Sequence, residues 1–248
     1  RLITEIVIVL GLSMGMSALY SIVNIAVRLS REAGLSSQTA TLNRSASELE
    51  WADFLYQTLG ILSSLVPVAL VVFLLWSNRK PHLGALGLDG SRWGRDSAAG
   101  LGLAALIGIP GLGLYLLGRE LDLTVTVVPS ALNTYWWTIP MLIALALRAG
   151  ILEEVIAVGY LFARLRQLGV SMWPIIVAQA VLRASYHLYQ GFGAFIGNFV
   201  MGLIFGWIYA KTGRLAPLII GHTVIDIVAF VGYPLALSFL PETLGFVL

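Results

Sequence analysis

Long apolar runs are the feature that most constrains how this chain can fold. A helix needs about 20 apolar residues to cross the ~30 Å hydrocarbon core of a bilayer. Seven stretches approach or exceed that length: 5–27, 54–76, 97–118, 135–165, 173–189, 192–210 and 215–232. A shorter apolar stretch, 234–248, is interrupted by Pro241. The sequence therefore predicts an all-α, polytopic membrane helix bundle of 7–8 transmembrane helices, forming a single domain over residues 1–248.

Composition supports a membrane protein and excludes several other classes. Hydrophobic residues make up 58% of the 248 and charged residues only 11%, whereas a soluble domain carries about 25% charged residues. The net charge of +2 is spread over the loops, so we expect no nucleic-acid partner, because such a partner needs clustered cations to displace counterions. The chain has no cysteine, which excludes disulfides and thiolate metal sites.

The distribution of Lys and Arg predicts the orientation. One set of connections carries nine of them, Arg1, Arg79, Lys80, Arg92, Arg95, Arg164, Arg166, Lys211 and Arg214, and the opposite set carries four, Arg28, Arg31, Arg44 and Arg119. Because cationic loops stay in the cytoplasm, we expect a cell-membrane protein with a cytoplasmic N-terminus. The external 28–53 connection is rich in Ser, Thr and Ala and shows no evident chemistry.

Two of the runs raise questions about their boundaries. Residues 5–27 are predicted to be a true span, because no small-residue cleavage site closes the run as it would in a signal peptide. The run 135–165 is long for one span. Pro140 and the sequence Arg148-Ala149-Gly150 are compatible with either a kink or a split into two helices, and the sequence does not decide between them.

Ionisable side chains inside the spans mark a candidate functional site. Each costs at least ~2.5–3.5 kcal/mol at the bilayer centre, and such residues are usually functional. Seven occur, on the fourth, fifth and seventh spans only: Arg148, Glu153, Glu154, Arg183, His187, His222 and Asp226. The two Glu, the two His and the Asp are all acid–base groups. We expect these five to converge on one cavity within the membrane.

Helical spacing places several of these residues on shared faces. Gln179, Arg183, His187 and Gln190 are spaced by 4, 4 and 3 residues, which forms one polar stripe along a helix. His222 and Asp226 are four residues apart, whereas adjacent Glu153 and Glu154 lie about 100° apart. Each residue also has a structural interpretation: a buried His is often only hydrogen-bonded, and the carboxylates could anchor Arg148 or Arg183. Asn198, Gly202 and Gly206 are better interpreted as close helix packing.

The order and spacing of the polar residues resemble a known family over roughly residues 135–232. The motifs are Glu153-Glu154 with Val158 four residues later, Arg183-x-x-x-His187, and His222-x-x-x-Asp226. They resemble the CPBP family, the CAAX proteases and bacteriocin-processing enzymes, also called the ABI family. That family carries Glu-Glu-x-x-x-Arg, Phe-x-x-x-His and His-x-x-x-Asn or Asp. Here Val158 replaces the family arginine and Arg183 replaces the phenylalanine.

The resemblance implies an intramembrane glutamate-dependent endopeptidase that cleaves membrane-associated peptides or proteins with an activated water. Glu153 is then the general base, aided by His187, and Glu154 supports the site electrostatically. His222 would donate to the oxyanion, and Asp226 would position His222. Because Arg183 is otherwise an uncompensated cation in the membrane, we expect it to replace the missing family arginine by pairing with Glu154.

Other functions use the same residues. Two His and one Glu could hold a catalytic zinc with an open position, although no cofactor is expected from the resemblance. A second alternative is an inactive family member that acts as a membrane scaffold or immunity protein, which Val158 favours. A proton-coupled transporter has less support, because the sequence shows no internal repeat of the kind that builds many transporters.

Overall fold

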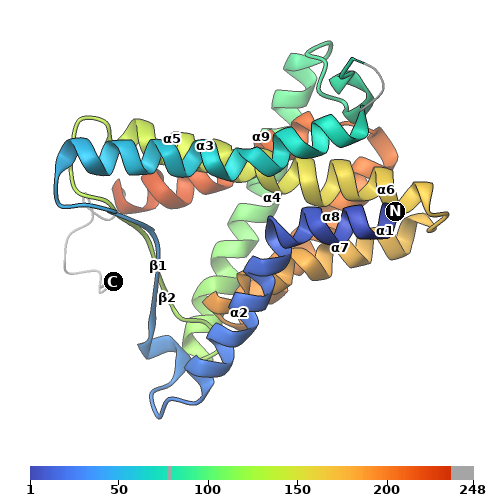
Figure 1. Ribbon diagram of the computed structural model, residues 1–248. Coiled ribbons are helices and arrows are strands. Elements are labelled where there is room, and N and C mark those ends of the chain that lie inside the picture. Colours follow the sequence, from blue (N-terminus) through green and yellow to red (C-terminus); the bar gives the residue numbers. More distant parts are fainter. Residues whose placement is uncertain (77–79, 236–248) are drawn as a thin grey trace.

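The computed structural model describes residues 1–76 and 80–235, and its fold is helical apart from one short pair of strands. In chain order the helices are α1 (Leu2–Gly11), α2 (Met14–Leu29), α3 (Glu50–Leu75), α4 (Trp93–Glu120), α5 (Thr138–Glu153), α6 (Leu161–Gln167), α7 (Met172–His187), α8 (Phe192–Thr212) and α9 (Ala216–Ile227). Figure 1 shows α3, α5 and α9 side by side, with α4 crossing behind them. The predicted all-α class is confirmed.

The number of helices that could cross a membrane is smaller than predicted. Among the described residues, four helices are long and apolar enough: Glu50–Leu75, Trp93–Glu120, Phe192–Thr212 and Ala216–Leu235. The bent pair α1–α2 makes a fifth if it counts as one span. The predicted count of 7–8 is therefore not confirmed. Within the runs 135–165 and 173–189, α5 and α7 each have only 16 residues. Arg79 and most of the 234–248 stretch lie outside the described residues.

The run 5–27, predicted to be one span, is broken in the structure. Helices α1 and α2 meet at an angle of 55°. The bend lies at Ser13, whose φ of −137° and ψ of −117° are not helical. The Ser13 hydroxyl donates to the Val9 carbonyl at 2.7 Å, which satisfies an acceptor near the end of α1. Apolar content alone could not reveal the bend, because both halves are hydrophobic.

The run 135–165 is one continuous helical path rather than two separate helices. A π-helical segment, Glu154–Tyr160, links α5 directly to α6. All seven of its residues are buried. π-helical turns occur often at functional sites, and this one begins at the second residue of the Glu pair. Helix α9 also continues into a π-helical turn, Val228–Gly232, which begins two residues after Asp226.

Two short strands join parts of the chain that are far apart in sequence. Strand β1 (Thr39–Arg44) pairs in parallel with β2 (Thr126–Ala131), with Thr39 opposite Thr126. Figure 1 shows the pair running from the ends of α2 and α4 to the starts of α3 and α5. A small apolar cluster of Ile25, Leu35, Ala40 and Val125 packs beside it. The 28–53 connection, which had no predicted structure, therefore contains one of the strands.

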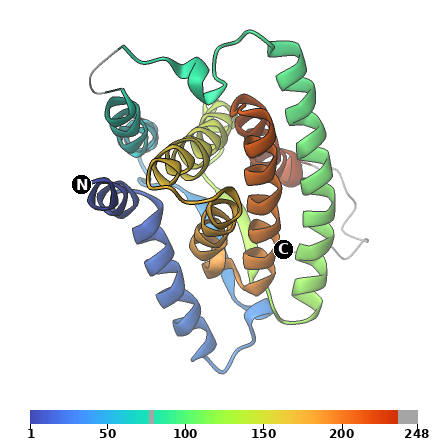
Figure 2. The ribbon, with the colours of Figure 1, turned by 90° about the vertical axis from the view of Figure 1, so that its right-hand side faces the viewer.

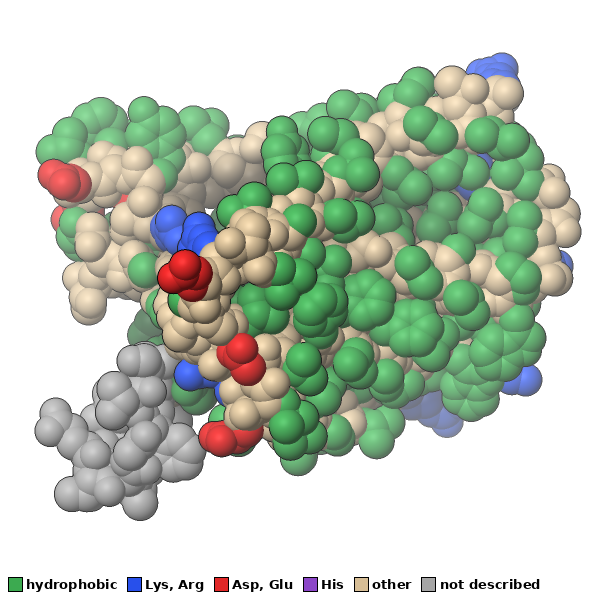
Figure 3. Space-filling model, turned by 90° about the horizontal axis from the view of Figure 1, so that it is seen from below, with side chains coloured by type: hydrophobic (Ala, Val, Ile, Leu, Met, Phe, Trp, Pro, Cys, Tyr) green, Lys and Arg blue, Asp and Glu red, His purple; other side chains and the backbone are tan. Residues whose placement is uncertain are grey.

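The protein buries its core around α6, α7, α8 and the π-helical segment, whereas its outer helix faces stay apolar. Figure 2 shows α7 and α8 within the bundle, between α2 on one side and α4 on the other. The largest core cluster includes Ile156, Val158, Tyr160, Ile176 and Phe205. Large hydrophobic side chains are also exposed, such as Ile109 (74%) and Trp136 (82%), and they cover much of the face in Figure 3. Such a surface fits lipid as the solvent.

An ion-pair cluster fixes the connection before α9. The Arg214 guanidinium donates to Asp96 at 2.6 Å and to Asp89 at 3.0 Å. In addition, the Leu215 amide donates to the Leu86 carbonyl at 3.0 Å. The hydrogen bonds from Arg214 and Ser91 lower the pKa of Asp89 below its usual range. These contacts hold the loop before α4 against the start of α9, the helix that carries His222.

We expect the contribution of Asp89 to stability to depend on pH. Its pKa is lowered in the folded protein, so its stabilising effect is present above the unfolded value of about 3.9 and is lost as pH falls below that value. Asp89→Asn should therefore lower the Tm at pH 7, and the difference from wild type should shrink below about pH 4. Glu48→Gln, in an exposed loop, is the control. A Tm difference that is constant with pH would contradict the prediction.

Candidate functional site

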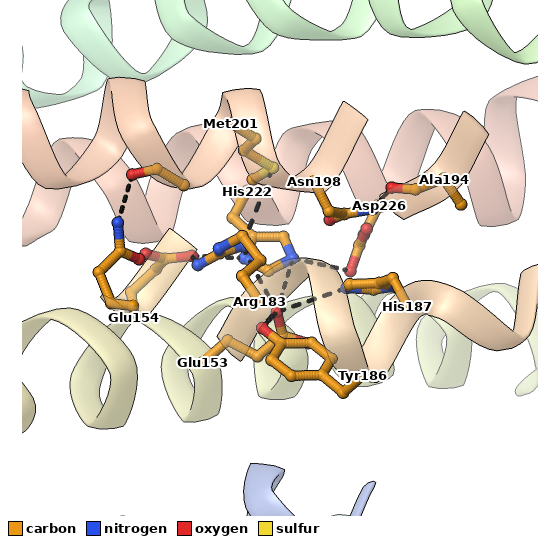
Figure 4. Close-up of polar contacts among 12 residues, drawn as sticks. Glu153, Glu154, Arg183, Tyr186, His187, Ala194, Asn198, Met201, His222 and Asp226 are labelled. Carbon is orange, nitrogen blue, oxygen red and sulfur yellow. Dashed lines mark hydrogen bonds and ion pairs between the residues drawn. The ribbon is translucent and has the colours of Figure 1, made fainter. Parts of the chain in front are cut away.

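The polar residues predicted on three separate spans meet in one place. Figure 4 shows them pointing toward one another from α5 and the π-helical segment that follows it, from α7 and from α9. The Nε2 atoms of His187 and His222 lie 3.9 and 3.8 Å from the same Glu153 oxygen, Oε2. Asp226 Oδ2 lies 3.6 Å from His222 Nε2. The structure thus brings together all five predicted residues, Glu153, Glu154, His187, His222 and Asp226.

Glu154 is the buried anchor of the cluster. Its side chain has no solvent exposure. The Arg183 Nη2 donates to its Oε1, and His222 Nδ1 lies 2.7 Å from the same oxygen. We predicted that Asp226 positions His222, but the structure assigns the hydrogen bond on this ring to Glu154. Asp226 lies at the other ring nitrogen, outside hydrogen-bond range. Glu154 therefore holds two cation-forming groups from α7 and α9.

Glu153 is the more accessible carboxylate. Its side chain is 14% exposed, and its Oε2 accepts a hydrogen bond from the Tyr186 hydroxyl at 2.6 Å. Arg183 Nη1 lies 3.5 Å from the same oxygen. Its other oxygen, Oε1, has no hydrogen-bond partner among the described residues. One oxygen is thus fixed by the protein, and the other is left available.

Arg183 lies beside the two glutamates, as its place in the sequence predicted. It is fully buried and bridges Glu154 and Glu153 with its two terminal nitrogens, instead of binding both oxygens of Glu154. Its guanidinium also lies 5.5 Å from the centre of the Phe205 ring, within the range of a cation–π contact. Val158, at the family arginine position, is buried in the apolar core. The expected contact between Arg183 and Glu154 is present.

The π-helical segment helps to explain how two adjacent glutamates serve one cluster. In an α-helix, neighbouring side chains diverge by about 100°, whereas a π-helix is wound more widely and turns less at each residue. The segment starts at Glu154, so the helix widens where the pair leaves it. Glu154 then points to the interior and Glu153 to the partly exposed side. Glu154 is therefore buried and Glu153 partly accessible, so the two carboxylates can take different roles.

His187 and Asp226 border the accessible side of the cluster together with Glu153. The His187 side chain is 21% exposed and that of Asp226 is 19% exposed. Neither ring nitrogen of His187 has a hydrogen-bond partner among the described residues. A buried polar atom without a partner costs free energy, so these nitrogens fit a bound water or substrate group. This side of the cluster is therefore where a reaction could occur.

The remaining polar residues of the spans lie outside the cluster. The Gln179 amide donates to the Gly202 carbonyl, and a Cβ at Gly202 would lie 2.7 Å from the Ala180 Cα. The interpretation of Gly202 and Gly206 as close helix packing is thus supported. Asn198 donates to the carbonyl of Ala194 in its own helix. Arg148 forms no ion pair with any described residue, and its Nε is buried without a partner.

Tyr186 is a site residue that the sequence analysis missed. Its hydroxyl makes one of the shortest contacts of the cluster, and the residue is 7% exposed. A signal was available, because a buried tyrosine hydroxyl in an apolar span needs a partner. Tyr186 also directly precedes His187. Tyr186 was missed because tyrosine was not counted among the ionisable residues of the spans.

We expect Tyr186→Phe to lower kcat about 10- to 100-fold if Glu153 is the base, because a hydrogen bond to a charged group contributes about 1.5–3 kcal/mol. The KM should change little, since the hydroxyl faces Glu153. The matched control is Tyr189→Phe, whose hydroxyl accepts a hydrogen bond from Gln190 instead. Equal losses of kcat in both variants, or a change confined to KM, would contradict a role in positioning Glu153.

The described residues contain no group of three or more His, Asp or Glu side chains arranged to hold a metal ion. The two imidazoles and Glu153 come nearest to such a set. However, Oε2 of Glu153 already accepts the Tyr186 hydroxyl and lies 3.5 Å from the Arg183 guanidinium. A fixed cation this close would repel a divalent ion. The donor set fits proton transfer better than metal coordination.

The segment that carries the polar cluster is similar to a known protein family. Residues 135–228 match the family model described as Rce1-like, type II CAAX prenyl endopeptidase. No curated protein matches the chain, and no solved structure does either. The matched segment contains all five predicted residues, Arg183 and Tyr186. The predicted resemblance to the CAAX protease family is therefore confirmed, and it rests on the segment that forms the polar cluster.

Proposed function

We propose that this membrane protein is an intramembrane endopeptidase in which Glu153 activates a water molecule. One observation carries the proposal: Glu153 is partly exposed, its Oε2 is fixed by Tyr186 at 2.6 Å, and its Oε1 has no partner among the described residues. A general base must lie within hydrogen-bond reach of the proton it takes. A water bound at Oε1 meets that condition.

The chemistry divides between Glu153 and the two histidines. Glu153 takes a proton from water as the oxygen attacks the peptide carbonyl carbon, and it returns that proton to the leaving nitrogen as the C–N bond breaks. His187, whose ring nitrogens have no hydrogen-bond partner among the described residues, orients the water or the leaving group. His222 Nε2 faces the same space as Glu153 Oε2, and a protonated ring there would donate to the oxyanion. Preorganised donors of this kind contribute about 3–4 kcal/mol.

The buried residues keep this arrangement in place. Glu154 holds His222 through Nδ1 and balances the charge of Arg183. Asp226 lies 3.6 Å from His222 Nε2 and stabilises positive charge on that ring. Arg183 bridges both glutamates, so it compensates for the absence of the family arginine at Val158. On this proposal the substitution at Val158 does not inactivate the site, in contrast to the alternative of a non-catalytic scaffold or immunity protein.

The family also guides the proposal for substrate and orientation. We propose that the substrate is a membrane-associated peptide or protein and that the N-terminus lies in the cytoplasm of the cell membrane. The excess of Lys and Arg on one set of connections supports this orientation. Because the chain has no cysteine, single cysteines at Glu48 and Ser91 can be labelled in intact cells. Glu48→Cys should react with an impermeant reagent and Ser91→Cys should not. The reverse result would invert the orientation.

Proteolysis can be tested directly in liposomes with two probes. One is a fluorogenic farnesylated peptide that ends in a CAAX sequence, and the other is an unmodified single-span peptide. Wild type should cleave at least one, and Glu153→Ala and His187→Ala should cleave neither, although both variants fold. Mass spectrometry of the products gives the cleaved bond. If wild type cleaves neither probe under any condition, the non-catalytic alternative is favoured.

Zinc hydrolysis is the second candidate, because the Nε2 atoms of His187 and His222 both lie within 4 Å of one carboxylate oxygen, Glu153 Oε2. In that case zinc would be held by His187, His222 and Glu153 and would supply an activated water. Metal analysis of the purified protein distinguishes the candidates. Stoichiometric zinc that is lost together with activity on chelation would favour zinc. Full activity in a protein without metal would favour Glu153 acting alone.

A further inference from the structure

A small cavity lies beside three helix ends, and no residue of the polar cluster lines it. Its volume is about 290 Å³. The lining comes from the end of α2 and the loop after it, from Asp122 and Leu123 after α4, and from Phe192 at the start of α8. The Phe192 amide donates to the Leu123 carbonyl at 2.7 Å, which holds two of these segments together. The cavity therefore joins parts of the chain that are far apart in sequence.

The cavity lies at the border of the apolar helix surfaces. Two candidate spans reach it with their ends, because α4 ends at Glu120 and α8 begins at Phe192. Figure 2 shows α2 and α4 ending on the same side of the molecule. Exposed apolar side chains lead toward it along α2, α4 and α8, such as Val27, Leu116 and Ile196. Figure 3, seen from that side, shows acidic and basic side chains beside the apolar surface, which is where lipid headgroups lie.

Two arginines of the cavity are not neutralised by the protein. Arg28 Nη2 donates to the Thr39 carbonyl at 3.1 Å, and its Nε is buried without a hydrogen-bond partner. Arg31 Nη1 donates to Gln38 Oε1 at the long distance of 3.5 Å. Neither guanidinium forms an ion pair with a described residue. The cavity therefore offers two cations that still have N–H groups to bind an anion.

Two carboxylates line the same cavity. Asp122 accepts hydrogen bonds from the Ser36 amide and hydroxyl at 2.7 Å each, which fixes its side chain. It is also the one described residue other than glycine with a positive φ, 57°, and such conformations cluster at ligand sites. Glu32 is exposed and forms no ion pair with a described residue. With two cations and two anions, the cavity fits a zwitterion better than a simple anion, since an anion alone would be repelled by the carboxylates.

We propose that this cavity binds the headgroup of a zwitterionic phospholipid that carries a primary ammonium. The phosphate would lie on Arg28 and Arg31, because guanidinium groups bind phosphate oxygens with charged, paired hydrogen bonds. The ammonium, with three N–H donors like that of lysine, would lie on Glu32 and Asp122. The acyl chains would follow the exposed apolar faces of the three helices. Basic pockets between membrane helices bind lipid headgroups, and the inference does not depend on the proposed proteolysis.

Lipid selectivity tests the assignment. Delipidated protein in detergent is titrated with phosphatidylethanolamine, phosphatidylglycerol or phosphatidylcholine of identical acyl chains, and bound lipid is counted by native mass spectrometry. Phosphatidylethanolamine should bind about 10-fold more tightly than the others, because phosphatidylglycerol brings no cation and choline has no N–H donor. Equal binding of the three lipids would overturn the inference. Free phosphoethanolamine is the probe for a soluble ligand, and its displacing the lipid at equal concentration would overturn the lipid as the occupant.

The cavity residues are tested with neutral variants. Arg31→Gln and Glu32→Gln change exposed side chains, so both proteins should unfold at the wild-type Tm. Arg31→Gln should weaken binding of phosphatidylethanolamine about 3- to 10-fold, and Glu32→Gln should reduce its advantage over phosphatidylglycerol to about 3-fold. Arg44→Gln is the control, because Arg44 is exposed and does not line the cavity. Binding by Arg31→Gln as tight as by Arg44→Gln, or an undiminished advantage in Glu32→Gln, would refute the site.

Discussion

Glu153→Gln and Glu154→Gln are expected to fail in different ways, although the residues are adjacent. Glu153→Gln should reduce kcat about 10²- to 10⁴-fold, the range that general acid–base catalysis contributes, and should leave the Tm nearly unchanged. Glu154→Gln should abolish activity and also destabilise the folded protein. Thermal unfolding in detergent and cleavage in liposomes, measured on both variants, separate a chemical loss from a structural one.

The difference follows from what each carboxylate contacts. Glu154 is fully buried and binds both Arg183 and His222. Removing one partner of a buried ion pair costs about 3–5 kcal/mol, because the remaining charge is left uncompensated. Glu153 is partly exposed, and a glutamine there can still accept the Tyr186 hydroxyl. It cannot take a proton from water at neutral pH, so only the reaction should suffer.

Two outcomes would contradict this division of roles. Residual cleavage by Glu153→Gln at near wild-type rates would remove Glu153 as the base. A Tm loss in Glu153→Gln as large as that in Glu154→Gln would mean that both carboxylates are structural. Glu5→Gln serves as a control for an ion pair elsewhere in the protein, because Glu5 accepts a hydrogen bond from Arg164 at 2.6 Å. It should lower the Tm without selectively lowering kcat.

The cluster was predictable from the sequence because ionisable residues inside an apolar span are rare and usually functional. Burying Glu, His and Asp in a membrane costs free energy, so their presence on three spans predicted one functional site. Helical periodicity then placed His222 and Asp226 on a shared face. The pairing of Arg183 with the glutamates followed from the same cost, since a buried guanidinium without an anion is unfavourable. Each of these inferences depended on local residue spacing and on the large free-energy cost of a charged side chain in the membrane.

Features that depend on long-range contacts or small energies were not predictable. The β1–β2 pair joins residues about 87 positions apart, such as Thr39 and Thr126, and no local pattern encodes a parallel pairing. The bend at Ser13 divides one apolar run into two helices that are both hydrophobic. Tyr186 was overlooked because tyrosine was not counted among the ionisable residues of the spans, although its buried hydroxyl needed a partner. The hydrogen bond between Glu154 and His222 depended on how the π-helical segment turns the pair.

Arg183→Phe, which restores the family residue at that position, is expected to damage this protein. The guanidinium bridges Glu154 and Glu153 with both partners buried or nearly so, so its loss should cost about 3–5 kcal/mol of unfolding free energy. Two adjacent carboxylates without a cation would repel each other and lose hydration. We therefore expect a lower Tm and little or no cleavage, measured in detergent and liposomes respectively.

The second step is to move the cation between helices. Val158 lies four residues after Glu154 on the same helical path and is fully buried, so an arginine there leaves the backbone one turn from the glutamates. Combining Arg183→Phe with Val158→Arg should recover much of the lost Tm and activity, because the new phenylalanine vacates the space of the old guanidinium. Combining Arg183→Phe with Val158→Met, of similar length but uncharged, should recover neither. Failure of the arginine pair to exceed the methionine pair would show that Arg183 does more than supply the missing charge.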